Sequence, residues 1–261
     1  MKVLVIPDVH QTAKGIQYAK EHIDEVDKVV FLGDYVDNWD SKEYWVSTEN
    51  NPIHIIEELA KFNDKVDLLI GNHDLAYLSP GVYAAYCSGH QTNHHIEIKY
   101  AFKSNILSRL KVAVEYDGVV FSHGGIGKMF FDRFVKQESL YGFEVNKTNF
   151  VERLNSAFEE SIGTEDPSKM RIKCRHYFLD HYGYNPYGDD CSEGPLWIRP
   201  SALCDLPSEF NIQVVGHTEF RTKTPIVFGN DKIKLICVDT PDHDLFYVVD
   251  TENIPEIINR V

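Results

Sequence analysis

Cysteine is scarce in this sequence, and its spacing matches no metal or disulfide motif. The five cysteines form an odd set without a C-x-x-C pair: Cys87, Cys174, Cys191, Cys204 and Cys237. Such a set supports neither a disulfide framework nor a cysteine zinc site. We therefore expect reduced thiols and a cytoplasmic protein.

Long apolar runs are also absent. No stretch approaches the roughly 20 apolar residues that a membrane-spanning helix needs. The N-terminal MKVLVIP is too short for the apolar region of a signal peptide, and it runs directly into Asp8. The sequence therefore predicts no membrane segment.

Positive charge is in deficit. Lys and Arg number 26 against 40 Asp and Glu, which gives a net charge of −14 at pH 7. Binding to a nucleic-acid backbone needs clustered Lys and Arg, so a nucleic-acid partner is disfavoured. A small phosphorylated substrate remains compatible with this charge, and bound cations would neutralise part of it.

Several well-known catalytic loops are missing. The sequence contains no G-x-x-x-x-G-K-[ST] loop, no G-x-S-x-G elbow and no reactive-cysteine context. Nucleotide switches and covalent hydrolases therefore have no support. The length of 261 residues suits one large domain or two small ones, and no linker or repeat divides it. We predict a single domain over residues 1–261.

The apolar pattern predicts an α/β protein that becomes β-rich toward its end. Strands are expected at 2–7, 28–32 and 66–70, and helices at about 14–24 and from Pro52 to Phe62. Helical segments are expected between 74 and 111, and a helical insertion at approximately 125–182. Asp117-Gly118 predicts a hairpin between 111–116 and 119–123. After a loop at 183–195, the β runs are 213–217, 224–229, 234–240 and 245–249.

Five polar signatures stand directly after apolar runs. In open α/β sheets, ligands bind beyond the carboxyl ends of the strands, so these side chains are expected to meet. Carboxylate and imidazole groups together suit a divalent metal ion. The signatures are Asp8-Val9-His10, Asp34, Asn72-His73-Asp74, His123 and His217.

Each signature also has a purely structural interpretation. Asp8 can cap a helix, Gly33-Asp34 is a common turn pair, and Asn and Asp are frequent turn residues. A lone histidine such as His123 or His217 is more often structural than metal-binding. The shared placement of all five after apolar runs favours a metal site over five unrelated turns.

Taken together, the motifs resemble those of a known family, the calcineurin-like metallophosphoesterases. The His-Gly-Gly and Gly-His-Thr forms resemble its phosphoprotein phosphatase branch, which includes bacterial and phage enzymes. Nuclease and cyclic-nucleotide branches usually end in Gly-His-x-His, where this chain has Glu219. The resemblance rests on Asp8-x-His10, Gly33-Asp34-Tyr35-Val36-Asp37, Gly71-Asn72-His73-Asp74, His123-Gly124-Gly125 and Gly216-His217-Thr218.

The resemblance implies a fold and a set of residue roles. The fold would be an α/β sandwich of two mixed β-sheets flanked by helices. One metal ion would be held by Asp8, His10 and Asp34, and a second by Asp34, Asn72, His123 and His217. His73 would be the general acid, with Asp37 orienting it.

Two divalent ions are therefore the expected cofactors. We take manganese as the first choice. Iron and zinc are alternatives, because Asp, His and Asn side chains suit all three metals. A hydroxide shared by the two ions would attack phosphorus, and the ions would stabilise both the attacking and leaving oxygens.

Two departures from the family pattern concern the substrate. The branch usually has Arg-Gly after the position of Asp37, whereas this chain has Asn38-Trp39. Its Asn-His-Glu is Asn-His-Asp here. Arg199, in Leu196-Trp197-Ile198-Arg199-Pro200, resembles the second phosphate-binding arginine of the branch, and Arg221 is the fallback. Either arginine can equally be an ordinary surface residue.

Three functional hypotheses follow. The first is hydrolysis of phosphomonoesters, on a phosphoprotein or a phosphorylated small molecule. The second is symmetrical hydrolysis of dinucleoside polyphosphates. The third is a non-catalytic metal-binding scaffold, which the missing Arg after Asp37 keeps open. A nuclease is disfavoured by the negative charge and by Glu219.

Overall fold

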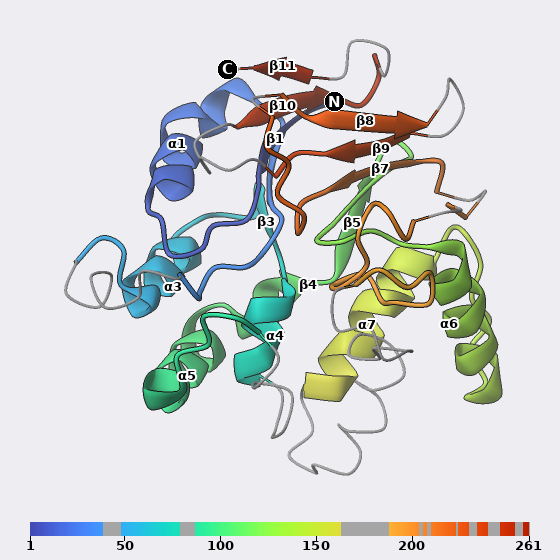
Figure 1. Ribbon diagram of the computed structural model, residues 1–261, viewed down its shortest axis with the longest axis horizontal. Coiled ribbons are helices and arrows are strands. Elements are labelled where there is room, and N and C mark those ends of the chain that lie inside the picture. The colour runs from blue at the N-terminus through green and yellow to red at the C-terminus, as the bar shows by residue number, and fades with distance from the viewer. Residues whose placement is uncertain are drawn as a thin grey trace.

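Two mixed β-sheets packed face to face form the centre of the protein (Figure 1). The computed structural model describes residues 1–38, 48–78, 87–162, 188–203, 206–207, 210–222, 224–229, 234–239, 246–253 and 258–260. Helices flank both sheets. The fold is therefore the α/β sandwich that the family resemblance implies.

The first sheet, sheet A, has six strands in the order β11-β10-β1-β2-β3-β4. Strands β1 to β4 run parallel to one another, and β10 and β11 add antiparallel pairings. Its strands are β1 (Lys2–Ile6), β2 (Lys28–Phe31), β3 (Val66–Leu69), β4 (Leu110–Lys111), β10 (Tyr247–Asp250) and β11 (Ile258–Arg260).

The second sheet, sheet B, has five strands in the order β5-β6-β7-β9-β8. Strands β6, β7 and β9 are parallel, whereas β5 and β8 pair antiparallel at the edges. Its strands are β5 (Ala113–Tyr116), β6 (Val119–Ser122), β7 (Ile212–Val215), β8 (Ile226–Gly229) and β9 (Lys234–Cys237).

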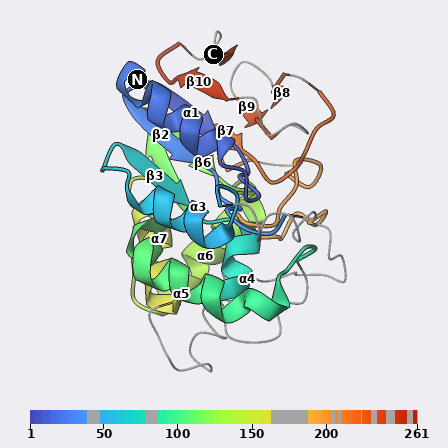
Figure 2. The same ribbon diagram turned by 90° about the vertical axis from the view of Figure 1, so that its left-hand side faces the viewer.

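The helices begin where the sequence offers starting signals. In α3, the Asn51 side chain accepts a hydrogen bond from the Ile53 backbone N–H, and Pro52 occupies the first turn. Figure 2 looks onto α1 and α3, which lie over sheet A. The helices are α1 (Lys14–His22), α3 (Pro52–Ala60), α4 (Asn72–Leu78), α5 (His95–Asn105), α6 (Lys128–Leu140) and α7 (Phe150–Ile162).

Alternating side chains on the central strands divide between two cores. In β1, Val3 and Val5 belong to the core between the sheets, whereas Leu4 and Ile6 pack toward the helices. This alternation is the two-residue period of a strand. Because both faces are covered, the run reads as uninterrupted apolar sequence.

The apolar run 111–116 differs from its prediction. It was expected to form one strand, but Leu110–Lys111 pairs in sheet A and Ala113–Tyr116 pairs in sheet B. Val112 lies between them and is fully buried. The chain therefore passes from one sheet to the other here, which the local pattern does not reveal because both halves are apolar.

Other boundaries are close to expectation. The hairpin at Asp117-Gly118 forms, with positive φ at both residues, as a type I′ turn requires. Within the expected insertion at 125–182, α6 and α7 are helical, and residues 163–182 lie outside the described part. Strand β11 was not predicted. No helix in the described ranges is long and apolar enough to cross a membrane.

Candidate metal centre

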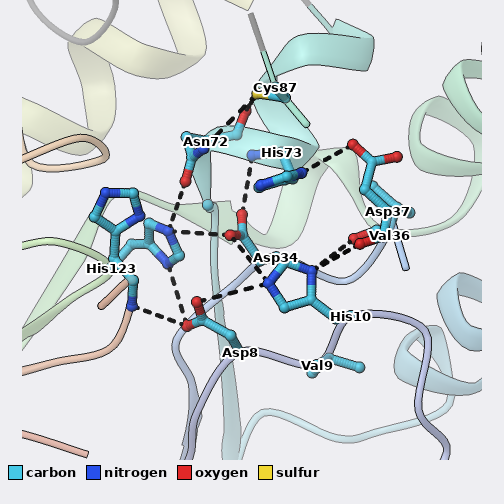
Figure 3. Close-up of polar contacts among 12 residues, drawn as sticks. Asp8, Val9, His10, Asp34, Val36, Asp37, Asn72, His73, Cys87 and His123 are labelled. Carbon is cyan, nitrogen blue, oxygen red and sulfur yellow. Dashed lines mark hydrogen bonds and ion pairs between the residues drawn. The ribbon is translucent and has the colours of Figure 1, made fainter. Parts of the chain in front are cut away.

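The predicted site residues follow strands of both sheets. β1, β2 and β3 are parallel neighbours in sheet A, and β6 and β7 are parallel neighbours in sheet B. Their carboxyl ends therefore lie at corresponding edges. Figure 3 shows the side chains of Asp8, His10, Asp34, Asn72 and His123 pointing toward one another.

Strained backbone marks the turns that carry these side chains. Of the six non-glycine residues with positive φ in the described ranges, five belong to this site: His10, Gln11, Asp34, Asp37 and His217. A residue in that region costs about 1–3 kcal/mol, so such residues persist only where the surroundings hold them. The cluster is typical of a functional site.

Two glycines allow carboxylates to approach the backbone closely. A Cβ atom at Gly71 would lie 2.0 Å from Asp34 Oδ1, and one at Gly216 would lie 2.4 Å from Asp8 Oδ1. Any side chain at either position would displace a predicted ligand. Glycine is therefore required at both places.

His10, Asp8 and Asp34 form one side of the centre. His10 Nδ1 lies 2.9 Å from the Asp37 carbonyl oxygen, so Nδ1 donates and Nε2 is left for a ligand role. Nε2 is 4.0 Å from Asp8 Oδ2 and 3.8 Å from Asp34 Oδ2. The ring orientation is thus set by the backbone.

His123, Asn72 and Asp34 form the other side. His123 Nδ1 lies 2.9 Å from the Leu32 carbonyl oxygen, which again directs Nε2 inward. That Nε2 lies 2.9 Å from Asn72 Oδ1 and 3.3 Å from Asp34 Oδ2. His217 Nε2 lies 3.0 Å from the Trp197 carbonyl oxygen, which leaves Nδ1 for a metal ion.

The spacing of these atoms fits divalent ions. Two groups have ligand atoms within 4.8 Å of one another, namely His10-Asp34-His73 and Asp34-His123-His217. Ligands about 2.1 Å from a tetrahedral ion stand about 3.4 Å apart, close to the separations of 3.3–4.0 Å seen here. Asp34 is common to both groups. The donor set therefore suits two neighbouring cations that share one carboxylate.

His73 and Asp37 form a buried pair beside these groups. His73 Nδ1 lies 3.0 Å from Asp37 Oδ2, and Asp37 is fully buried. Burial alone would lower the pKa of His73, but Asp34 and Asp37 outweigh it and raise that pKa. The pair can hold and deliver a proton, although His73 also lies close enough to Asp34 to bind a metal ion.

Asp74 ties the two turns of the site together. Its Oδ2 accepts hydrogen bonds from the backbone N–H groups of Asp34 (2.8 Å) and Gly71 (2.9 Å), and its Oδ1 accepts one from Tyr35 (2.8 Å). Burial, and then the negative charge of Asp34, raise the pKa of Asp74 to about 8. One side chain therefore sets the position of both turns.

The electrostatics of the site are dominated by burial and mutual attraction. Burial opposes ionisation of Asp34, yet His123 and His73 outweigh it and lower the pKa of Asp34. The pKa of His123 rises to about 10, because Asp34 and Asp8 offset the effect of burial. Burial, and then the charge of His123, lower the pKa of His217.

Two residues near the site were missed by the sequence analysis. Burial raises the pKa of Asp8, and the negative charge of Asp239 raises it further. Asp239 is therefore close to the candidate metal ligands. Asp239 is buried and follows β9, and the strand-end rule would have found it. Cys87 Sγ lies 3.7 Å from Asn72 Nδ2, which helps turn the amide oxygen toward His123. No local signal marks Cys87.

The structure separates the two candidate arginines. Arg199 carries a buried Nε without a hydrogen-bond partner in the described part of the chain, and its charge contributes to lowering the pKa of His217. Arg221 is exposed beyond the His217 turn. Arg199 is therefore the arginine whose charge acts on the His217 side of the centre, and its binding of phosphate stays a prediction.

Asn38 occupies the position where the resemblance leads us to expect Arg, and its hydrogen bonds are to neighbouring protein groups. Its Nδ2 donates to the His10 carbonyl oxygen at 2.8 Å, and its backbone N–H donates to Gln11 Oε1 at 2.9 Å. Asn38 therefore ties the Asp37 turn to the His10 turn. It offers no positive charge to a substrate.

Comparison with known families gives one match. A model for calcineurin-like phosphoesterases matches residues 1–218. That range includes every predicted metal ligand and both members of the His73–Asp37 pair. No curated protein matches the chain.

Three solved structures resemble the chain, each at low sequence identity. A metallophosphoesterase from Sphaerobacter thermophilus has 14% identity and a TM-score of 0.45, covering 100% of this chain and 88% of that one. A protein serine/threonine phosphatase from Saccharomyces cerevisiae with similarity to human phosphatase PP5 has 12% identity and a TM-score of 0.42, covering 95% and 72%. The phosphatase domain of the Legionella effector WipB has 13% identity and a TM-score of 0.47, covering 88% and 80%. At these identities none of them indicates a substrate.

Proposed function

Because the chain belongs to the calcineurin-like phosphoesterase family, we propose that it is a phosphatase that hydrolyses phosphomonoesters with the help of two divalent cations. The observation that carries this proposal is the position of Asp34, whose Oδ2 lies 3.8 Å from His10 Nε2 and 3.3 Å from His123 Nε2. A shared carboxylate is typical of two-metal phosphoryl-transfer sites.

The proposed ligands divide around Asp34. Asp8, His10 and Asp34 would hold one cation, and Asp34, Asn72, His123 and His217 the other. Bound there, the cations would make water nucleophilic near neutral pH and neutralise charge on the phosphoryl oxygens. Manganese is the first candidate, with iron and zinc as alternatives, because the donor set suits all three.

His73 is proposed to protonate the leaving group. Its Nδ1 is engaged by Asp37 at 3.0 Å, which leaves Nε2 as the nitrogen that can give up a proton. Asp34 and Asp37 favour the protonated ring, so the proton is available near neutral pH. A departing alkoxide would receive that proton and leave as an alcohol.

Arg199 is proposed to bind the phosphate. Trp197, two residues earlier, accepts a hydrogen bond from His217 through its carbonyl oxygen, which ties this segment to the metal centre. Guanidinium groups match phosphate oxygens in geometry and charge. The net charge of −14 fits a compact phosphorylated substrate better than a nucleic acid.

A substrate comparison tests the proposal. Purified protein with Mn²⁺ is given p-nitrophenyl phosphate, a phosphopeptide and diadenosine tetraphosphate. We expect turnover of the two monoesters to exceed that of the dinucleotide. Preferred cleavage of diadenosine tetraphosphate would instead identify a dinucleoside polyphosphate hydrolase. Two bound metals without any turnover would identify a scaffold.

Metal binding is expected to release a proton. A cation at His123 Nε2 requires the neutral ring, and the pKa of His123 is raised to about 10. The proton is therefore bound below that pH and competes with the metal, so affinity rises with pH by up to about tenfold per unit. Calorimetric titrations at neutral pH in two buffers with different ionisation enthalpies would count the protons. Binding without proton release would contradict this expectation.

A further inference from the structure

Tyr77 lies one helical turn beyond His73 on α4. Residues four apart face the same side of a helix, and both side chains reach Asp37. The Tyr77 hydroxyl donates to Asp37 Oδ1, while His73 Nδ1 engages Asp37 Oδ2. One helix therefore holds both oxygens of the same carboxylate.

The Asp37 carboxylate is held by more contacts than its hydrogen bond with His73. Asp37 is fully buried and has a positive φ of 63°, and its own carbonyl oxygen lies 2.9 Å from His10 Nδ1. With a donor on each oxygen, rotation of the carboxylate would break two hydrogen bonds. The Nδ1 contact of His73 is thereby fixed in direction.

The Tyr77 hydroxyl is itself held in one role. It accepts a hydrogen bond from the Gln91 backbone N–H at 2.8 Å, so its proton is directed to Asp37. Burial, and then the negative charge of Asp37, raise the pKa of Tyr77 far above its usual range. The hydroxyl therefore stays protonated, and so a donor, well above neutral pH.

A short segment, residues 87–91, supports Tyr77 from behind. The His90 ring stacks on the Tyr77 ring at a centroid distance of 4.4 Å and an interplanar angle of 29°. Gln91 Nε2 donates to Gln11 Oε1, which links this segment to the turn after His10. The tyrosine ring thus has little freedom to withdraw its hydroxyl.

We propose that Tyr77 is a positioning residue for proton transfer, and that it acts on His73 through Asp37. This inference rests on the proposed role of His73 as the proton donor. Without the hydroxyl, Asp37 Oδ1 would be a buried acceptor without its donor, and the carboxylate could turn away from His73. The imidazole would then lose the alignment that delivers its proton to the leaving oxygen.

The test is Tyr77→Phe, which keeps the ring and its stacking but removes the hydroxyl. We expect kcat to fall about 10- to 100-fold, as for supporting residues of other catalytic groups, with KM and metal content nearly unchanged. The loss should be larger for alkyl phosphates than for p-nitrophenyl phosphate, because alkoxides need the proton more. A purely structural role would not depend on the leaving group.

Tyr116→Phe is the matched control. Tyr116 also donates its hydroxyl to a buried carboxylate, that of Asp67, but on the strands away from the metal centre. The same deletion there should leave kcat unchanged. In an Asp37→Ala background, Tyr77→Phe should cause no further loss of kcat, because its effect passes through Asp37. Full additivity of the two changes would overturn the proposal.

A spectroscopic readout separates this inference from the proposed function. In the zinc-loaded protein, the His73 Nδ1 proton should give a downfield NMR resonance that moves or broadens in Tyr77→Phe and not in Tyr116→Phe. If that resonance responds but no phosphomonoester is hydrolysed by the wild type, the proposed function fails and the positioning holds. If the wild type is active, but neither the resonance nor kcat changes in Tyr77→Phe, the proposed positioning role of Tyr77 is wrong.

Discussion

Asp34→Asn is expected to remove most of the bound metal and nearly all turnover. Asp34 Oδ2 lies 3.8 Å from His10 Nε2 and 3.3 Å from His123 Nε2, so one oxygen serves both sides of the centre. Its Oδ1 accepts the backbone N–H of His73 at 2.9 Å. An amide can keep only one of these two functions.

Both orientations of the asparagine amide are unfavourable. With its NH₂ group at the Oδ2 position, the amide would point hydrogen atoms at the cations. With NH₂ at the Oδ1 position, it would face the N–H of His73. We expect at most one ion per chain and a loss of kcat of about 10³-fold or more, because a central charge is removed from a buried site.

Metal analysis after gel filtration and kcat on p-nitrophenyl phosphate measure these effects. Asp67→Asn is the matched control, since Asp67 is a buried carboxylate in β3 that pairs with Lys111. That control should retain both ions and full turnover. Two ions per chain in Asp34→Asn would show that Asp34 is not the shared ligand.

His73→Ala is expected to keep the metal ions and lose turnover. General acid catalysis contributes about 10²–10⁴-fold, so kcat should fall by that factor on alkyl phosphates and by less on p-nitrophenyl phosphate. The difference between the two substrates is the informative quantity. It reports whether the missing group supplied a proton.

The same variant decides between two roles for His73. The ring lies within ligand distance of Asp34 and His10, so it can be read as a metal ligand as well as an acid. Metal content measured in His73→Ala distinguishes them, and His54→Ala, a partly exposed histidine on α3, serves as control. Loss of an ion in His73→Ala would assign His73 to the metal centre.

The placement of the site could be anticipated from the sequence because parallel strands deliver their carboxyl ends to one edge. That rule brought together Asp8, Asp34, Asn72 and His123, which lie far apart along the chain but within a few ångströms in space. The same rule applied to the LICVD run would have added Asp239. His217, which follows β7, also lies at this edge.

Other features could not be anticipated because they depend on contacts between distant segments. Tyr77 looks like any other residue of a buried helix, and only the folded chain shows its hydroxyl on Asp37. The division of 110–116 between two sheets is hidden for a similar reason, since an apolar run does not say which partner strand it meets. The role of Asn38 as a tie between two turns also appears only in the fold.

The three hydrogen bonds of Asp74 have a consequence for how the centre is assembled. They join the Asp34 turn to the Gly71 turn through protein groups alone, so the ligand-bearing backbone is preorganised and little ordering entropy remains to oppose metal binding. We therefore expect bound ions to exchange in the folded protein without refolding. We also expect the metal composition of the protein to follow the ions supplied by its surroundings.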